Sequence, residues 1–481
     1  MDLRFYNTLG RRVQRFEPIT PGRVGVYACG PTVYDYQHIG NLRTYLFEDI
    51  LRRVLQYAGY EVTHVMNVTD VGHLVGEAEN GEDKMIKSAR EKGRSVWEIA
   101  EHYTRIFFRD CASMSILEPT VVCRATDHID DMIGFIAELE RKGYTYTAGG
   151  NVYFDIGRFP DYGKMALLSV DDLKAGARID VDANKKNPLD FVLWFTRSKF
   201  PHQAMLWDSP WGRGYPGWHI ECSAMSMRYL GERIDIHCGG VDHISVHHTN
   251  EIAQSEALTG KKWVNFWMHG EYLLTTGEKM AKSQGNFLTL AALMEQGYEP
   301  MDYRYYLLGA HYRTQLQFSG QALDSARNAL RRLRERLAQL REEAGASGTA
   351  EASAQGRRGS GVDFAGIEGE GYLRSFLQNA ASDLNMPRCL SDLWALLKDD
   401  AVSAAARLAT LYEMDRILGL GLAEWAPRET ELSAEERRLV EERDRARAEK
   451  DYQKADHIRN ILEKRGIIVE DTPQGSRCRR R

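Results

Sequence analysis

Residues suited to binding phosphate lie where a β-like run meets a helix. The run at 24–30 is followed by His38, Gly40 and Asn41, and then by an amphipathic helix expected over 42–57. A helix N-terminus attracts phosphate, and glycine lets a ligand approach the backbone closely. By itself, this pattern is also typical of an ordinary polar helix start.

A second motif far downstream supplies positive charge. Lys279 and Lys282 lie in a glycine-flanked stretch at 277–286, after an expected strand at 263–267 and His269. Such a basic loop could close over a triphosphate, although it could also be a solvated basic turn. Either motif alone is a weak signal, but the two together in this order favour an ATP-binding enzyme.

Four residues with metal-binding side chains are each expected at the start of a helix or the end of a strand on the same side of the sheet: Cys29, Cys222, His247 and Glu251. The last two are four residues apart on an expected helix, so their side chains point the same way. Two thiolates and an imidazole suit zinc, and a carboxylate can complete the tetrahedron. Singly, each residue is better explained as a small buried cysteine or part of a surface ion pair. As a set, given the sheet order, they predict a zinc site.

The elements that must position these residues alternate between strand and helix. A strand at 24–30, the helix at 42–57 and a strand at 61–70 predict a β-α-β unit, which implies a parallel sheet with a right-handed crossover. Ligands of such sheets bind beyond the carboxyl ends of the strands. We therefore expect an α/β fold: a Rossmann-like parallel-sheet catalytic domain with an insertion, followed by an α-helical region.

Changes of pattern along the chain predict separate segments. Ser433 is expected to cap a charged helix, with Glu436 in the capping-box position. A stretch rich in Ala, Ser and Gly predicts a flexible linker. The expected boundaries are 1–120 and 191–290 for the two halves of the sheet domain, 121–190 for the insertion, 291–343 and 371–481 for two helical regions, and 344–370 for the linker.

The composition is that of a globular protein. The chain of 481 residues is 43% hydrophobic and 27% charged, and no apolar run approaches the roughly 20 residues that span a bilayer. The N-terminus lacks the long apolar segment of a signal peptide. Seven thinly spread cysteines are not a disulfide framework. We therefore expect a cytoplasmic protein without a membrane partner. The sequence does not determine the oligomeric state, for which a monomer is the default expectation.

The charge balance limits how the chain could bind nucleic acid. A formal net charge of −5 argues against indiscriminate binding of polyanions. Any such site must be a local basic patch, and an arginine-rich helix at 324–343 and the arginines of the tail at 477–481 are candidates. Both could instead be solvated faces, as charge runs usually are.

Longer stretches around these motifs resemble a single family, the cysteinyl-tRNA synthetases, which are class I aminoacyl-tRNA synthetases. The two phosphate motifs are similar to the HIGH and KMSKS signatures of that class. The stretches that carry the resemblance are Cys-Gly-Pro-Thr-Val-Tyr at 29–34, His-Ile-Gly-Asn at 38–41, Gly-Trp-His-Ile-Glu-Cys-Ser-Ala-Met at 217–225, His-His-Thr-Asn-Glu-Ile-Ala-Gln at 247–254 and Lys-Met-Ala-Lys-Ser at 279–283. Segments within 446–475 resemble the anticodon-binding tail of the same family.

The resemblance implies a role for each candidate residue. The four metal-binding residues match the zinc ligands of the family, and Cys29, Thr69 and Trp218 would line the amino-acid pocket. A substrate cysteine could bind the zinc through its thiolate, which serine cannot imitate. The catalytic residues would be His38, Asn41, Lys279 and Lys282, and ATP would be bound by His38, Gly40, His269 and Lys282.

The implied reaction has two steps. Cysteine would attack ATP, accompanied by Mg²⁺, to give cysteinyl adenylate, and the cysteinyl group would then pass to the 3′ end of tRNA(Cys). The 371–481 region would bind the anticodon loop. Asn41 stands where the class signature has a second histidine, so its contact with phosphate would be a neutral hydrogen bond. Ala281 and Cys478 are further departures from the family pattern.

Two alternatives remain open. An ATP-dependent ligase that joins cysteine to a small amino-sugar acceptor resembles the same catalytic half, although it would not need the region 371–481. A non-catalytic RNA-binding paralogue would be expected to lose part of the metal set or of the lysine motif.

Overall fold

The chain folds into two units, Met1–Ala423 and Glu424–Arg481. The computed structural model describes residues 1–71, 84–165, 182–197, 205–275, 278–279, 287–346, 368–427, 432–472 and 475–480. Most of the linker expected at 344–370 lies outside these residues. No helix in the described ranges combines the length and apolar character that crossing a bilayer requires.

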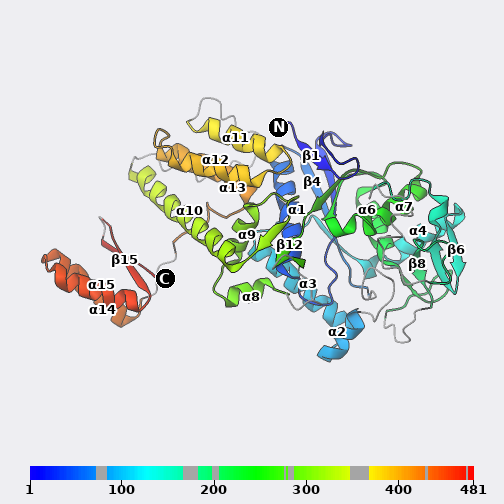
Figure 1. The fold of residues 1–481 in the computed structure, drawn as a ribbon, viewed down its shortest axis with the longest axis horizontal. Coiled ribbons are helices and arrows are strands. Elements are labelled where there is room, and N and C mark those ends of the chain that lie inside the picture. Colours follow the sequence, from blue (N-terminus) through cyan, green and yellow to red (C-terminus); the bar gives the residue numbers. More distant parts are fainter. Residues whose placement is uncertain are drawn as a thin grey trace. The chain divides into compact units, whose positions relative to one another are not determined.

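A parallel sheet of five strands forms the centre of the first unit (Figure 1). Its order is β11-β10-β3-β4-β5, with β3 at Arg23–Ala28, β4 at Glu61–Val68, β5 at Val121–Arg124, β10 at Ile234–Gly240 and β11 at Val264–Gly270. Every neighbouring pair is parallel. The predicted β-α-β unit and the Rossmann-like sheet are therefore confirmed, because α1 at Ile39–Tyr57 connects β3 to β4.

The sequence of each element explains its burial. Val24, Val26 and Tyr27 of β3 are all buried, as expected for a parallel strand covered on both faces. Four helices accompany the sheet and its strand ends: α3 at Val96–Ser113, α4 at Ile129–Arg141, α6 at Trp218–Leu230 and α7 at His247–Thr259. The shorter α2 at Lys84–Lys92 precedes α3 and packs against it.

The insertion forms an antiparallel sheet of its own. Its strands are β6 at Thr145–Ala148, β7 at Asn151–Phe154, β8 at Phe191–Phe195 and β9 at Tyr215–Pro216, in that order. The sequence analysis placed 191–290 in the second half of the parallel sheet, but β8 pairs antiparallel with both β7 and β9. Four of the five residues of β8 are buried, so its pattern resembles that of a strand in either sheet.

Helices after the sheet complete the first unit: α8 at Leu290–Glu295, α9 at Pro300–Leu308, α10 at Gly320–Ala346, α11 at Glu370–Ala381, α12 at Met386–Lys398 and α13 at Ala404–Leu418. Two small sheets accompany them: β1 at Arg4–Asn7 with β2 at Arg12–Arg15, and β12 at Leu273–Thr275 with β13 at Glu278–Lys279 and β14 at Leu316–Phe318.

Buried Arg304 of α9 locks these helices to the sheet domain. Its guanidinium donates to the Asp49 carboxylate on α1 at 2.7 Å, and to the carbonyls of Met114 and Leu418 at 2.8 Å. A fully buried charge requires such a complete set of partners.

The second unit contains α14 at Ala434–Ala448, α15 at Tyr452–Lys464 and a hairpin of β15 at Ile467–Thr472 with β16 at Gly475–Arg480. Its core is formed by Val440, Ile458, Leu462, Ile467 and Val469. The capping box predicted for Ser433 and Glu436 is present. The boundary between the units falls inside the region expected at 371–481, because α11, α12 and α13 pack within the first unit.

One buried side chain in the sheet lacks polar partners. His64 of β4 is 3% exposed, and neither of its ring nitrogens has a hydrogen-bond partner in the described part of the chain. Burial, reinforced by nearby Arg52, lowers the pKa of His64 from 6.5 to about 3. The unfolded chain therefore takes up a proton below pH 6.5 that the folded chain refuses until about pH 3, so this residue destabilises the fold as the pH falls.

Replacing His64 with leucine should remove this pH dependence. The stability advantage of His64→Leu over the wild type should grow by about 2 kcal/mol between pH 7 and pH 5, since only the wild type has the site to protonate on unfolding. Thermal and denaturant midpoints measured across this range test the expectation. The exposed His457 of the second unit provides the control, and an equal effect of His457→Leu would contradict it.

Candidate active site

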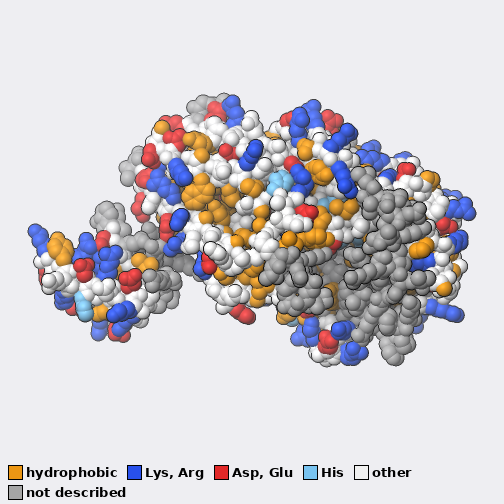
Figure 2. All heavy atoms as spheres, viewed as in Figure 1, with side chains coloured by type: hydrophobic (Ala, Val, Ile, Leu, Met, Phe, Trp, Pro, Cys, Tyr) orange, Lys and Arg blue, Asp and Glu red, His pale blue; other side chains and the backbone are white. Residues whose placement is uncertain are grey.

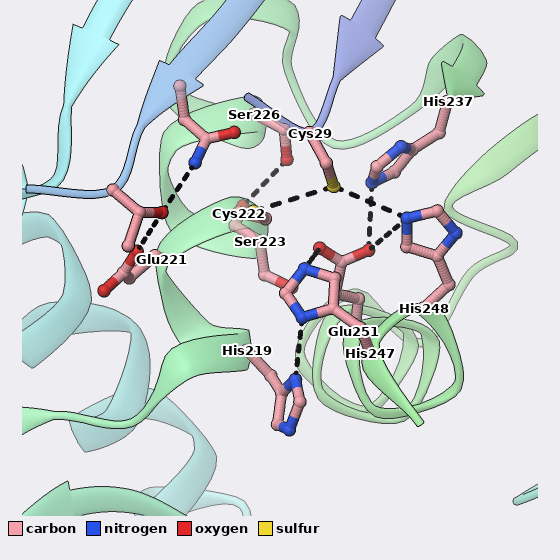
Figure 3. Close-up of polar contacts among 12 residues, drawn as sticks. Cys29, His219, Glu221, Cys222, Ser223, Ser226, His237, His247, His248 and Glu251 are labelled. Atoms are coloured by element: carbon pink, nitrogen blue, oxygen red, sulfur yellow. Dashed lines mark hydrogen bonds and ion pairs between the residues drawn. The ribbon is translucent and has the colours of Figure 1, made fainter. Parts of the chain in front are cut away.

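The four predicted metal-binding residues meet at the carboxyl end of the parallel sheet (Figure 3). Cys29 directly follows β3, Cys222 lies on α6, and His247 and Glu251 lie on the first turns of α7. Their ligand atoms all lie within 4.8 Å of one another, and all four residues are buried. Parallel pairing of β3 and β10 explains why Cys29 meets His247 and Glu251, because both strands end at this edge, and Cys222 reaches the same edge from α6.

The distances within this cluster suit a metal ion. The Sγ atoms of Cys29 and Cys222 are 4.0 Å apart, too far for a disulfide but close to the separation of about 3.8 Å that two thiolates adopt on one tetrahedral ion. His247 Nε2 lies 3.0 Å from Glu251 Oε1. The donor set of two sulfurs, one imidazole and one carboxylate fits a borderline-soft divalent cation.

A second, overlapping set includes two histidines that the sequence analysis missed. His237 and His248 join Cys29 and Glu251 in a cluster that meets the same distance criterion. His237 Nε2 lies 2.9 Å from Glu251 Oε2, and Cys29 Sγ lies 3.4 Å from His248 Nε2. A single histidine within an apolar strand such as β10 gives no signal of this role. His248 could have been predicted, because it follows the predicted ligand His247 directly at the start of α7.

Outer contacts fix the rings of this cluster. His247 Nδ1 lies 2.9 Å from His219 Nδ1, and His248 Nδ1 lies 2.8 Å from His269 Nε2. The other ring nitrogen of His269 contacts the Thr8 hydroxyl at 2.7 Å. Partners of this kind set the tautomer and orientation of metal-binding histidines.

The electrostatics of the cluster balance acids against imidazoles. Burial raises the pKa of the Cys29 thiol, while the contact with Cys29 lowers the pKa of the Cys222 thiol. Burial lowers the pKa of His247, but the Glu251 carboxylate and Cys222 outweigh this and raise it to about 10. Burial likewise opposes ionisation of Glu251, yet His237 and His247 hold its pKa well below the usual value. A bound cation could take over this balancing role and release protons.

Residues proposed for an amino-acid pocket surround the cluster. The Thr69 hydroxyl donates to Glu221 Oε2 at 3.0 Å and accepts from the side-chain Nδ2 of Asn67 at 3.1 Å. Half-buried Trp218 begins α6, and its ring centroid lies 5.1 Å from that of His247. Thr69 and Trp218 therefore both adjoin the first turn of α6, because Glu221 follows Trp218 by three residues on that helix. The sequence analysis did not identify Asn67 and Glu221 as the side chains that hold the Thr69 hydroxyl in place.

The phosphate motif forms the start of α1. His38 Nδ1 accepts from the Asn41 amide nitrogen at 3.1 Å, and Asn41 Oδ1 accepts from the His38 amide nitrogen at 3.2 Å. The two residues thus form a reciprocal capping box. A Cβ at Gly40 would lie 3.0 Å from His38 Nδ1, so glycine leaves room for the His38 ring.

Both flanks of the lysine motif are anchored at α1. Before it, the Arg43 guanidinium donates to the carbonyls of Glu271 and Tyr272. After it, the Ile39 amide donates to the Leu288 carbonyl at 2.8 Å. Lys282 and the side chain of Lys279 lie outside the described residues. The chain nevertheless enters and leaves the lysine motif beside the helix start that carries His38.

An open parallel sheet with a capped helix start and a lysine motif anchored beside it has the architecture of a class I aminoacyl-tRNA synthetase. The model of the "tRNA synthetases class I (C) catalytic domain" matches residues 15–328. A methionyl-tRNA synthetase of Mycobacterium tuberculosis in complex with methionyl-adenylate shares the fold with a TM-score of 0.55 at 15% identity, over 83% of this chain and 90% of that one. A ternary complex of Agrobacterium radiobacter K84 agnB2 LeuRS with tRNA and LeuAMS gives a TM-score of 0.57 at 12% identity, over 85% of each chain.

Full-length relatives narrow the assignment. The chain is 51% identical to the cysteine–tRNA ligase of Treponema denticola, over 98% of both chains. It is 48% identical to cysteine–tRNA ligase 1 of Burkholderia lata, over 99% of this chain and 97% of the relative. The model of the "Cysteinyl-tRNA ligase anticodon binding domain" matches residues 429–479. This chain belongs to the cysteine–tRNA ligase family.

Gly30 provides a test of how the site is built. Its amide donates to Asn67 Oδ1 at 2.9 Å, and a Cβ on this residue would lie only 1.6 Å from the Asn67 carbonyl oxygen. Gly30→Ala must therefore push β3 away from β4 next to Cys29. We expect this variant to lose most of its bound metal and at least about tenfold in amino-acid activation.

Elemental analysis and amino-acid activation assays measure these losses. Gly134 on α4 is the matched control, because a Cβ there meets nothing within 4 Å. Gly134→Ala should keep metal and activity, and retention of both by Gly30→Ala would refute the predicted clash.

Proposed function

We propose that this chain attaches L-cysteine to tRNA(Cys) in two steps. The carboxylate of cysteine attacks the α-phosphate of ATP, which forms cysteinyl adenylate and releases pyrophosphate. The cysteinyl group then passes to the terminal ribose of the tRNA, and AMP leaves. The observation that carries this proposal is the buried set of Cys29, Cys222, His247 and Glu251 at the ligand-binding edge of the sheet.

Zinc is the metal that best fits this set. The two sulfurs and the imidazole are ligands that zinc prefers, and the carboxylate is the member most easily exchanged. When bound, zinc would hold the substrate through its thiolate and so discriminate against serine, whose hydroxyl is far harder to deprotonate. Cys29, Thr69 and Trp218 would line the pocket around the substrate.

Activation of cysteine depends on phosphate binding at the start of α1. His38, Gly40 and Asn41 would hold ATP there, and Mg²⁺ would accompany the nucleotide. His269 was also expected to bind ATP, but it is buried and its two ring nitrogens contact His248 and Thr8. The helix dipole and the two lysines, Lys279 and Lys282, would stabilise the negative charge that develops on the phosphoryl oxygens. The reciprocal cap between His38 and Asn41 supports this role, because it fixes both side chains before ATP arrives.

Binding of tRNA would involve both units. On α10, Arg334 and Arg336 form ion pairs with acidic side chains of the protein, whereas Arg331 and Arg332 are exposed. The exposed arginines are therefore the side chains of this helix that would contact the phosphates of the tRNA backbone. The second unit would read the unpaired anticodon loop. Its basic and acidic side chains are intermixed on the face shown in Figure 2, which favours local contacts over a broad attraction to polyanions.

The match to an anticodon-binding domain at 429–479 weighs against a small-acceptor ligase. The presence of all four metal-binding residues weighs against a non-catalytic paralogue. A cytoplasmic location and a monomeric state stay predictions.

Loss of one sulfur should disable the metal site selectively. Cys222→Ser should lower zinc affinity by more than about tenfold and weaken cysteine activation in parallel. Metal content by mass spectrometry and competition with a chromogenic chelator provide the readouts. Cys389→Ser is the control, because this buried thiol on α12 donates to the Phe376 carbonyl of α11 and does not contact the cluster. Equal zinc affinity in Cys222→Ser and the wild type would rule out this ligand set.

ATP–pyrophosphate exchange tests the whole assignment. Zinc-loaded protein should catalyse exchange with cysteine but not with serine at the same concentration, and should charge purified tRNA(Cys). Exchange without charging would instead favour the small-acceptor ligase. Absence of exchange with every amino acid would leave the RNA-binding alternative.

A further inference from the structure

A cavity of about 130 Å³ lies between α1, β4 and the C-terminal end of α3. Its walls are mostly apolar, and they include Tyr45, Met66, Phe107 and Leu117. None of the residues proposed above to bind metal, cysteine or ATP lines it. At its rim, Ala112 and Glu118 are exposed, so the cavity reaches solvent.

One polar side chain in the wall has nothing to bind within the protein. His64 is 3% exposed, and both of its ring nitrogens lack a partner among the described residues. Asp49 also lines the cavity, but its carboxylate is already bound to Arg53, Arg304 and the Leu117 amide. A neutral imidazole offers one hydrogen-bond donor and one acceptor.

The segment at 115–119 covers the cavity and is tied to α1 by three contacts. Asp49 accepts from the Leu117 amide at 2.9 Å, Arg53 donates to the Ser115 carbonyl at 2.7 Å, and Arg52 donates to the Glu118 carbonyl at 2.5 Å. These polar contacts hold the segment away from the floor of the cavity, so the apolar walls do not close on one another.

Water suits the inner end of this cavity poorly, although the rim reaches solvent. A buried water needs two to four polar partners, whereas an engineered apolar cavity of 150 Å³ stays dry and binds benzene. A cavity of similar size with one unpartnered imidazole calls for an aromatic ring that also carries a hydrogen-bonding group. At the inner end of the cavity a charged ligand would find no uncompensated opposite charge, because the Asp49 carboxylate is fully engaged and the other carboxylate of the lining, that of Glu118, lies at the exposed rim.

We propose that this cavity is a binding site for small uncharged aromatic molecules with one hydrogen-bonding group, and that His64 selects them over purely apolar rings. The proposal does not depend on the proposed function, since the cavity and the candidate active site share no residue.

Binding of phenol and toluene to the full-length protein tests this proposal. Calorimetry and ligand-observed NMR should show phenol binding at least about tenfold more tightly than toluene, the gain expected from one good hydrogen bond. His64→Leu should reverse the preference. No saturable binding of phenol, or the same preference in His64→Leu, would overturn the proposal and indicate a cavity filled by water alone.

A variant at the rim tests whether phenol binds in this cavity or elsewhere on the protein. Ala112→Trp should block phenol and toluene, because the new ring covers the opening. Ser113→Trp is the matched control: Ser113 is exposed next to Ala112 but does not line the cavity, so binding should persist. Circular dichroism and thermal melting check the fold of each variant. Unchanged phenol binding by Ala112→Trp would place the ligand elsewhere and refute the site.

Discussion

Desolvation of ionisable side chains at one edge of the parallel sheet is the constraint on which the site depends. Cys29, Cys222, His247 and Glu251 come from three separate elements and are all buried. Buried charges are costly unless they are paired. Within the protein, imidazoles pair with the carboxylate, and a bound dication would replace the protons on them. The same ion pairs between imidazoles and Glu251 therefore affect both the stability of this edge and its affinity for a metal ion.

Helix α1 links this edge to the rest of the first unit. Its first turn carries the His38 cap, Arg43 holds the carbonyls that precede the lysine motif, and Asp49 is bound to Arg304 of α9. A displacement of α9 would therefore also move α1, whose first turn carries the His38 cap. The same Asp49 fixes the segment over the His64 cavity, so the cavity adjoins the interaction that holds this helix in place.

The sequence predicted the features that depend on local pattern and on strand order. The β-α-β unit and the capping box of Ser433 follow from periodicity and capping chemistry. The meeting of Cys29 with His247 and Glu251 follows from β3 and β10, parallel strands that end at one edge. The sheet that contains β8 could not be predicted, because a strand buried on both faces looks alike in parallel and antiparallel sheets. The role of His237 was also hidden, since one histidine in an apolar strand is typical of an ordinary core.

The two overlapping ligand sets differ in what they offer a metal ion. Both contain Cys29 and Glu251, but only one contains the second sulfur. Glu251 turns Oε1 toward His247 and Oε2 toward His237, so one oxygen faces the sulfur-rich set while the other is held by the second imidazole. An anchored carboxylate can loosen its hold on a metal without losing its own position. The geometry therefore favours His237 as the group that orients Glu251, and it favours the two thiols and His247 as the firmer ligands of the proposed zinc site.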